Sequence, residues 1–311
     1  MLLAQFPWRL GQLLWLAANL AAVAGSAVLL WRLYAGEWKR AGLAVVVALT
    51  FAPTPFLLML GQISGFLLLG LVGFLWAVKS ERWMLAGTLA ALTAIKPHLL
   101  VAFACVLVLQ SLRGNAVWRS VVAGGVVLVV FGLIPLAWDS AVWSQYLVGT
   151  AAPSTEKQPS VQDWEHPTLG YMIRDALPGR PFAAMFIPLG VALPLVAGYW
   201  WLRRENWDWG TELPRLVLVS LVAAPYGAWV FDLVLLLVPV IQATTWIAND
   251  SRRLMCMLAG GLYLVLNLLA FGSMENAGWT ANPWIVPLTV TGYIAAGLLT
   301  KAGVTPAPAS R

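Results

Sequence analysis

The sequence has 311 residues, of which 60% are hydrophobic and only 10% are charged, and its mean hydropathy is +0.80. Soluble domains carry about 25% charged residues, so this chain cannot cover a globular surface with polar groups, and lipid must surround most of it. The net charge of +6 does not indicate nucleic-acid binding, because the basic residues lie in small groups between apolar stretches and form no basic face.

Apolar stretches of about 17–25 residues recur along the whole chain, and a helix needs this length to cross a bilayer. Backbone groups in lipid must be bonded within their own segment, so each stretch is predicted to be a helix. The sequence therefore predicts an all-α, polytopic integral membrane protein with about 10–11 transmembrane or half-spanning helices. We expect a single multi-spanning domain, residues 1–311. The predicted helices are residues 10–33, 41–60, 63–78, 84–95, 98–111, 120–137, 182–202, 214–225, 231–247, 254–271 and 283–300.

Two of the longest apolar stretches are predicted to be broken. Pro97 lacks a backbone N–H and disfavours helical conformation at Lys96, so residues 84–110 are divided into two helices. Residues 213–247 would form one helix of roughly 52 Å, which is too long for a single crossing. The residues Pro225-Tyr226-Gly227 provide the break in this second stretch.

The distribution of basic residues predicts the topology. With the N-terminus outside, most of the 19 Lys and Arg residues lie in the inner loops, as the positive-inside rule requires. If residues 84–110 formed one span, every later loop would lie on the opposite side of the membrane, and the excess of basic residues in the inner loops would be lost. Four polar interruptions then meet at the outer face and are expected to line an outward-opening cavity. They are Gly61-Gln62, Lys96-Pro97-His98, the extracytoplasmic loop 138–181, and Pro225 to Asp232.

Lys96 is the strongest candidate for a binding residue. A cation near membrane depth costs about 2.5–3.5 kcal/mol by insertion scales, so it is rarely found there without a partner. Its point charge and three N–H donors suit an anionic head group such as a phosphate. His98 is a candidate for a second donor to the same phosphate, or for a proton carrier. The alternatives are a lysine that extends to the interface from a short helix end, and a histidine that caps a helix start.

Gln62 and three residues of the later break are candidates for lining the pocket. The Gln62 amide can hydrogen-bond a sugar or a phosphate, although a Gly-Gln pair also suits a simple turn. Asp232 begins a predicted helix, where a carboxylate can cap the N-terminus. Alternatively, Asp232 binds substrate or orients Lys96 or its histidine neighbour. Tyr226 and Trp229 offer aromatic faces for stacking.

The 138–181 loop is the one long polar segment. Asp163, Glu165 and His166 are weak candidates for acid/base chemistry, and the alternative is that these side chains only face solvent. A short helix starting near Pro167 is expected to lie over the cavity mouth. The sequence has no phosphate-cradling glycine loop and no metal-ligand spacing, so neither a cofactor nor a metal is predicted.

Several short motifs occur in a specific order along the chain. They are Gly61-Gln62, Ala86-Gly87, Ala94-Ile95-Lys96-Pro97-His98, and Ala224-Pro225-Tyr226 followed by Trp229 and Asp232. Together they resemble glycosyltransferase family 87, whose members are GT-C-type membrane enzymes that include polyprenol-phosphate-mannose-dependent α-mannosyltransferases. The resemblance extends from about Phe6 to Leu299.

This resemblance implies a GT-C-like fold with an extracytoplasmic catalytic cavity, in a multi-pass protein of the bacterial plasma membrane. The implied partners are a polyprenyl-phosphate sugar donor, a glycolipid or glycan acceptor, and the lipid bilayer. The transferred sugar is then a hexose, in particular mannose. Lys96 is expected near the donor phosphate, Gln62 and His98 in the pocket, and Asp232 in a later turn.

The chain departs from the family pattern at its start. GT-C enzymes place their catalytic Asp or Glu in the first extracytoplasmic loop, whereas this chain begins at what would be the second span. The sequence therefore predicts that an N-terminal span and the first catalytic loop are missing. Two other functions remain open, namely a transporter or flippase of lipid-linked sugars, and an inactive fragment or scaffold. Broken helices are also typical of transporters.

Overall fold

The computed structural model describes residues 6–114, 116–151, 167–250, 252–277 and 283–300. Within these ranges the chain is helical and has no β-strand. The α-helices are α1 (Trp8–Leu33), α2 (Ala41–Thr50), α3 (Pro53–Met59), α4 (Ser64–Lys79), α5 (Trp83–Ala90), α6 (Val101–Ser111), α7 (Trp118–Leu133), α8 (Val142–Ala151), α9 (Leu169–Ala176), α10 (Ile187–Arg203), α11 (Trp209–Ala223), α12 (Leu237–Ala248), α13 (Arg253–Ala277) and α14 (Ile285–Leu299). The 3-10 helices are η2 (Trp38–Arg40), η3 (Ala91–Ile95), η4 (Pro97–Leu99), η5 (Ile134–Ala137), η6 (Phe182–Phe186), η7 (Arg204–Asn206) and η8 (Asp232–Leu236).

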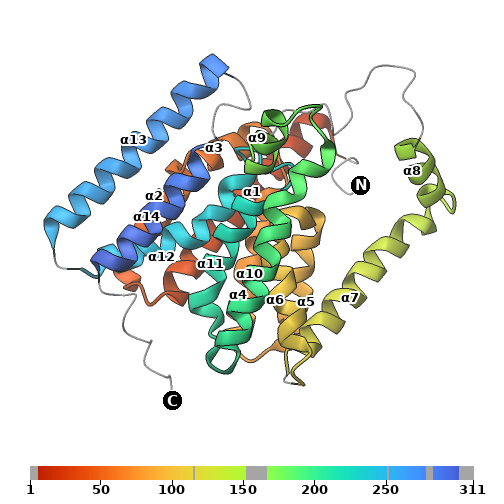
Figure 1. Ribbon diagram of the computed structural model, residues 1–311, viewed down its shortest axis with the longest axis horizontal. Helices are drawn as coiled ribbons and strands as arrows, with labels where there is room; N and C mark the ends of the chain where they lie inside the picture. Colours follow the sequence, from red (N-terminus) through yellow and green to blue (C-terminus); the bar gives the residue numbers. More distant parts are fainter. Residues whose placement is uncertain (1–5, 115, 152–166, 251, 278–282, 301–311) are drawn as a thin grey trace.

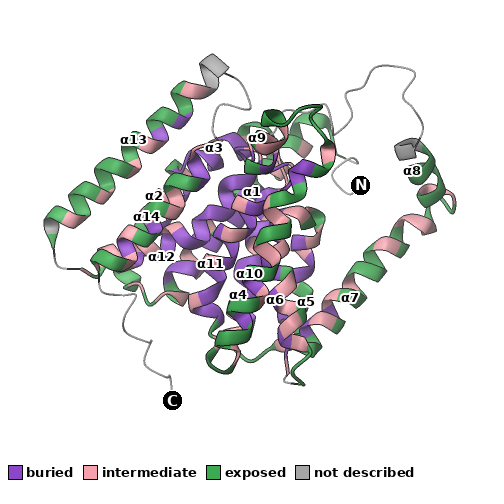
Figure 2. Cartoon of the chain, in the orientation of Figure 1, coloured by how far each residue is buried: buried purple, intermediate pink, exposed green. Residues whose placement is uncertain are grey.

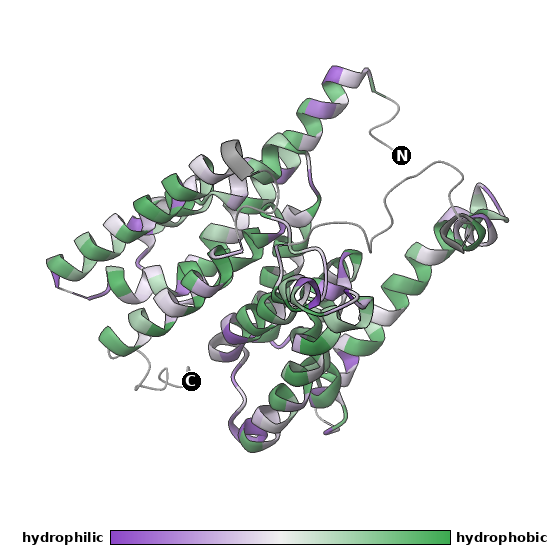
Figure 3. Ribbon diagram, turned by 45° about the horizontal axis from the view of Figure 1, so that its top comes forward, coloured by the Kyte–Doolittle hydropathy of each residue, from purple (hydrophilic) through white to green (hydrophobic). Residues whose placement is uncertain are grey.

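Most of the helices form a central bundle, while α7 and α13 lie on opposite sides of it (Figure 1). The helices of the bundle are buried, whereas α7 and α13 are exposed along much of their length (Figure 2). The exposed side chains of these two helices are largely apolar (Figure 3), and Phe131 on α7 and Met257 on α13 are examples. Surrounding lipid accounts for such extended apolar faces, because water does not tolerate them.

The lengths of the helices agree with a membrane protein. Four described helices are long and apolar enough to cross a bilayer, and α2 with α3 forms a fifth span if the bent pair is counted as one. The four are Trp8–Leu33, Trp118–Ala137, Phe182–Asn206 and Leu254–Ser273. Five shorter apolar helices accompany them, namely Ser64–Lys79, Trp83–Ile95, Val101–Ser111, Asp232–Ala248 and Ile285–Leu299. The predicted all-α, polytopic fold is confirmed.

The helix predicted at 41–60 is in fact two helices that meet at an angle of 62°. Pro53 and Pro55 both lack the backbone N–H that would continue the hydrogen-bond ladder of α2, so the ladder ends at Thr50. The free N–H of Ala52 instead donates to the Asn267 side-chain oxygen on α13. The 138–181 loop also contains more structure than expected, since it holds α8 as well as the predicted short helix, α9.

One end of the bundle collects basic side chains, and many of them donate to the carbonyl groups at helix C-termini. Cations stabilise helix C-termini because the last carbonyl groups have no partner within the helix and carry partial negative charge. These bonds run from Lys79 to Leu33, from Arg40 to Ala248, from Arg113 to Arg204 and from Arg252 to Leu299. Between α12 and α13, hydrogen bonds from Arg252 lower the pKa of Asp250 to about 2.

A close crossing of α5 and α7 supports the first testable prediction. A Cβ atom at Gly87 would lie 1.9 Å from the backbone oxygen of Ser120, and the Ser120 hydroxyl donates to the Trp83 carbonyl over 2.7 Å. Gly87→Ala is therefore expected to lower the free energy of unfolding by about 3 kcal/mol, because two backbones must separate. Unfolding in a denaturing detergent titration measures this change.

Gly125→Ala on α7 is the control, since a Cβ atom there meets no other atom within 4 Å. Alanine favours helix over glycine by about 1 kcal/mol, so this variant is expected to be as stable as the wild type or slightly more stable. Equal stability changes in the two variants would contradict the close crossing.

Candidate active site at three helix breaks

The first break separates α3 from α4. Gly61 has a left-handed backbone, with φ of 58°, which glycine adopts without strain. The Trp15 indole on α1 donates to the Gly61 carbonyl over 2.7 Å and fixes the turn against the bundle. α4 then begins at Ser64, whose side chain is fully buried.

The second break separates η3 from η4. Lys96 lies between these two short helices with φ of −133° and ψ of 73°, outside the helical region, and Pro97 opens η4. This geometry follows from the proline, which has no N–H and restricts the residue before it. The Lys96 side chain remains 20% exposed.

The third break separates α11 from η8. Gly227 and Ala228 both have left-handed backbones, with φ of 67° and 50°, and together they reverse the chain. η8 begins at Asp232, which donates its backbone N–H to the Trp229 carbonyl over 2.7 Å. No side-chain capping bond is formed at the start of η8, so Asp232 does not serve as an N-cap.

A charged cluster joins all three breaks. The Lys96 ammonium lies 2.6 Å from Oδ1 of Asp232, and the Ser64 hydroxyl donates to the same oxygen. Lys96 Nζ also lies 3.4 Å from Ser64 Oγ and 5.0 Å from the centre of the Phe231 ring. The Asp232 carboxylate is fully buried, and its second oxygen has no hydrogen-bond partner among the described residues. The cluster thus holds one cation beside one buried anion.

His98 forms a second contact between the same two breaks. Its ring stacks on Tyr226 with 4.5 Å between the ring centres and a tilt of 30°. A Cβ atom at Gly227 would lie 2.6 Å from His98 Nε2, so the ring occupies the space that only glycine leaves free. Lys96 and His98 are two residues apart in the second break, and both contact residues of the third break.

The helix α9 packs against this turn. Thr168 caps α9 by accepting a hydrogen bond from the Tyr171 N–H over 3.2 Å. A Cβ atom at Gly170 would lie 2.3 Å from the carbonyl oxygen of Met185 and 3.1 Å from that of Pro225. The end of the 138–181 segment thus lies against the third break, close to the other predicted interruptions.

The structure describes some of the other predicted site residues and not others. Gln62 and Trp229 are both half-buried at their breaks. Asp163, Glu165 and His166 lie outside the described residues. Ser64 was not among the predicted site residues, although its place two residues after Gln62, at the start of a helix, was a usable signal.

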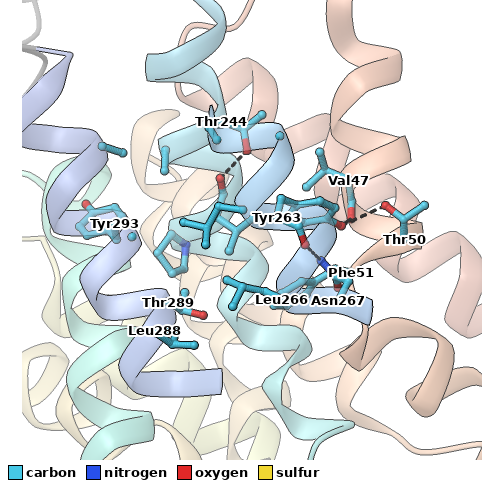
Figure 4. A pocket seen from close by; sticks show the side chains of 18 of the residues that line it. Val47, Thr50, Phe51, Thr244, Tyr263, Leu266, Asn267, Leu288, Thr289 and Tyr293 are labelled. Atoms are coloured by element: carbon cyan, nitrogen blue, oxygen red, sulfur yellow. Dashed lines mark hydrogen bonds between the residues drawn. The ribbon is translucent and has the colours of Figure 1, made fainter. Parts of the chain in front are cut away.

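An apolar cavity lies elsewhere, between α2, α12, α13 and α14 (Figure 4). It has a volume of about 500 Å³ and is lined mainly by apolar side chains. Its polar groups bond to one another, as the Tyr263 hydroxyl does with Thr50 and with the Val47 carbonyl. None of the predicted site residues lines this cavity, and its apolar lining suits hydrocarbon rather than a sugar or a phosphate.

The fold and the site together define a polytopic membrane protein with a charged cluster where its helices are broken. The chain belongs to glycosyltransferase family 87, whose family model matches residues 1–231. It is accordingly a membrane glycosyltransferase that acts on a sugar donor and an acceptor. No curated protein and no solved structure matches the chain. The matched range includes the first two breaks and ends one residue before Asp232.

Proposed function

We propose that the protein transfers a hexose, in particular mannose, from a polyprenyl-phosphate donor to a glycolipid or glycan acceptor at the extracytoplasmic face of the bacterial plasma membrane. The observation that carries this proposal is the position of Lys96. Its ammonium is held at a helix break in a membrane-embedded bundle, yet a fifth of the side chain remains exposed. A lipid-borne phosphate reaches such a site from the bilayer, and an ammonium is a suitable partner for it.

In the proposed reaction the bond between sugar C1 and the phosphate oxygen breaks, and its electron pair stays on the phosphate. A new bond forms between C1 and the acceptor oxygen, and the acceptor hydroxyl loses its proton to a base. The leaving phosphate gains negative charge, which Lys96 stabilises and to which His98 is the second donor. Gln62, Tyr226 and Trp229 surround the same breaks and are the proposed contacts for the sugar.

The base is proposed to come from the acidic part of the 138–181 segment, where Asp163, Glu165 and His166 are the candidates. The helix α9 follows these residues in the same segment, and it packs on the break that carries Tyr226 and Asp232. The packing of α9 on this break supports the proposal that the segment supplies the proton acceptor.

The second candidate function is the movement of lipid-linked sugars across the bilayer without transfer. The observation that favours it is the set of three broken helices around a paired charge, since transporters also use such elements. An inactive scaffold is the remaining alternative.

Reconstitution into lipid vesicles separates these functions. The purified protein is mixed with a radiolabelled polyprenyl-phosphate mannose and a glycolipid acceptor, and the labelled products are resolved by chromatography. We expect labelled acceptor and free polyprenyl phosphate to form together. Movement of the donor between leaflets with no new glycosidic bond would establish the transporter instead. If the donor is neither cleaved nor moved, the scaffold is the function that remains.

A further inference from the structure

We propose that Ser64 and Asp232 are positioning residues, which hold the Lys96 ammonium in place for the departing phosphate. This inference rests on the proposed function, in which Lys96 binds the phosphate of the donor. Ser64 and Asp232 are both fully buried, so neither side chain contacts substrate. They act through Lys96, which is the member of the cluster that remains partly exposed.

The cluster is not explained by stability alone. Burying a carboxylate costs several kcal/mol, and an ion pair repays this cost only when the remaining oxygen atoms are also satisfied. Here both donors meet at Oδ1 of Asp232, and Oδ2 has no hydrogen-bond partner among the described residues. An apolar residue of similar size is often the more stable choice at such a position. We therefore attribute the presence of a carboxylate at position 232 to its effect on Lys96.

The first effect of the cluster is to immobilise a flexible side chain. A lysine side chain has four rotatable bonds and loses rotamer entropy when it is fixed. Contacts with Asp232 at 2.6 Å and Ser64 at 3.4 Å fix the ammonium before any ligand arrives. These contacts use two of its three N–H donors, so one donor remains for the phosphate. Preorganised donors stabilise developing charge without reorganisation during the reaction.

The second effect concerns charge. The donor phosphodiester carries one negative charge, and the leaving phosphate monoester carries up to two once the C1–O electron pair has moved to it. The Asp232 carboxylate offsets the charge of Lys96 and weakens its attraction for both species. The charge offset therefore lowers the binding of donor and product, whereas the fixed position of Lys96 is what favours the transition state and raises kcat.

These two effects predict distinct kinetics for two variants of the full chain in nanodiscs, measured with polyprenyl-phosphate mannose and a glycolipid acceptor. Ser64→Ala removes a hydrogen bond to a charged group and is expected to lower kcat about tenfold, with the donor KM unchanged. Asp232→Asn is expected to lower kcat by about tenfold or more, while the donor KM falls and inhibition by polyprenyl phosphate becomes stronger. General structural damage would not lower KM.

Ser26→Ala is the matched control, because Ser26 is equally buried and its hydroxyl has no hydrogen-bond partner among the described residues. We expect wild-type kcat for this variant. Ser64→Thr keeps the hydroxyl and is expected to retain at least about half of kcat. Thermal unfolding of each variant shows whether the fold is kept.

The inference is overturned if Ser64→Ala matches Ser26→Ala, if Ser64→Thr loses as much activity as Ser64→Ala, or if Asp232→Asn raises the donor KM with kcat unchanged. A different result would contradict the proposed function itself, namely full turnover in Lys96→Ala. If Lys96→Ala is inactive while both positioning variants have wild-type kinetics, only the positioning roles are excluded.

Discussion

Lys96→Ala is expected to lower the rate of sugar transfer by about 10³-fold, because it removes the positive charge that stabilises the departing phosphate. The substitution also leaves Asp232 buried without its counter-charge, which costs about 3–5 kcal/mol of stability. Turnover at saturating donor in nanodiscs measures the first effect, and detergent unfolding measures the second. The double variant Lys96→Ala, Asp232→Asn carries no unpaired charge, so it is expected to recover stability while remaining inactive.

Lys79→Ala provides the control for the loss of a lysine. Lys79 ends α4 and donates to the Leu33 carbonyl over 2.6 Å, whereas Ser64 begins the same helix. The two ends of α4 are about 24 Å apart at 1.5 Å per residue. We expect this variant to transfer sugar at the wild-type rate. Loss of transfer in Lys79→Ala, or full transfer in Lys96→Ala, would contradict the assignment of the phosphate site.

Gly227→Ala is expected to lower kcat/KM for the donor by about 10–100-fold, because it displaces His98. The new methyl group would lie 2.6 Å from His98 Nε2, and the ring would have to leave its stack on Tyr226. The left-handed backbone at this position, with φ of 67°, adds a cost of about 1–2 kcal/mol for any residue with a Cβ atom. The donor titration and the unfolding experiment are carried out on the same preparation.

Gly114→Ala separates backbone strain from the displacement of His98. Gly114 has a similar φ of 71°, but a Cβ atom there meets no other atom within 4 Å. Both variants are therefore expected to lose stability through backbone strain, with a further loss in Gly227→Ala from the displaced ring, while only Gly227→Ala loses activity. Equal activity in both variants would show that the position of His98 does not matter for transfer.

The helices and the three site-forming breaks could be predicted from the sequence, because their causes are local. Pro97 and the Pro225-Tyr226-Gly227 turn constrain the backbone at their own positions, and the structure breaks the helices there. The same reasoning applies to Pro53 and Pro55, yet the apolar run around them was interpreted as one helix. Hydrophobicity alone does not reveal this bend, because α2 and α3 are both apolar and both lie in the bundle.

The pairing within the site could not be predicted from local patterns. Asp232 has three possible roles by sequence, as a helix cap, as a substrate ligand or as a partner of a basic side chain, and the structure shows the contact with Lys96 and no capping bond. Ser64 belongs to a helix that is apolar on all sides, so no periodic pattern identified its inward direction. Contacts between distant segments depend on packing, which the sequence of each segment does not specify.

The separation of Lys96 and Asp232 along the chain also sets an order of events during synthesis. The ribosome delivers Lys96 to the translocon 136 residues before it delivers Asp232. The first helices therefore enter the bilayer with an uncompensated cation, which costs about 2.5–3.5 kcal/mol near the membrane centre. Neutralisation waits until α11 has been inserted and η8 has been made. Nascent chains arrested before and after Asp232 has left the ribosome thus differ in whether this lysine has acquired its counter-ion.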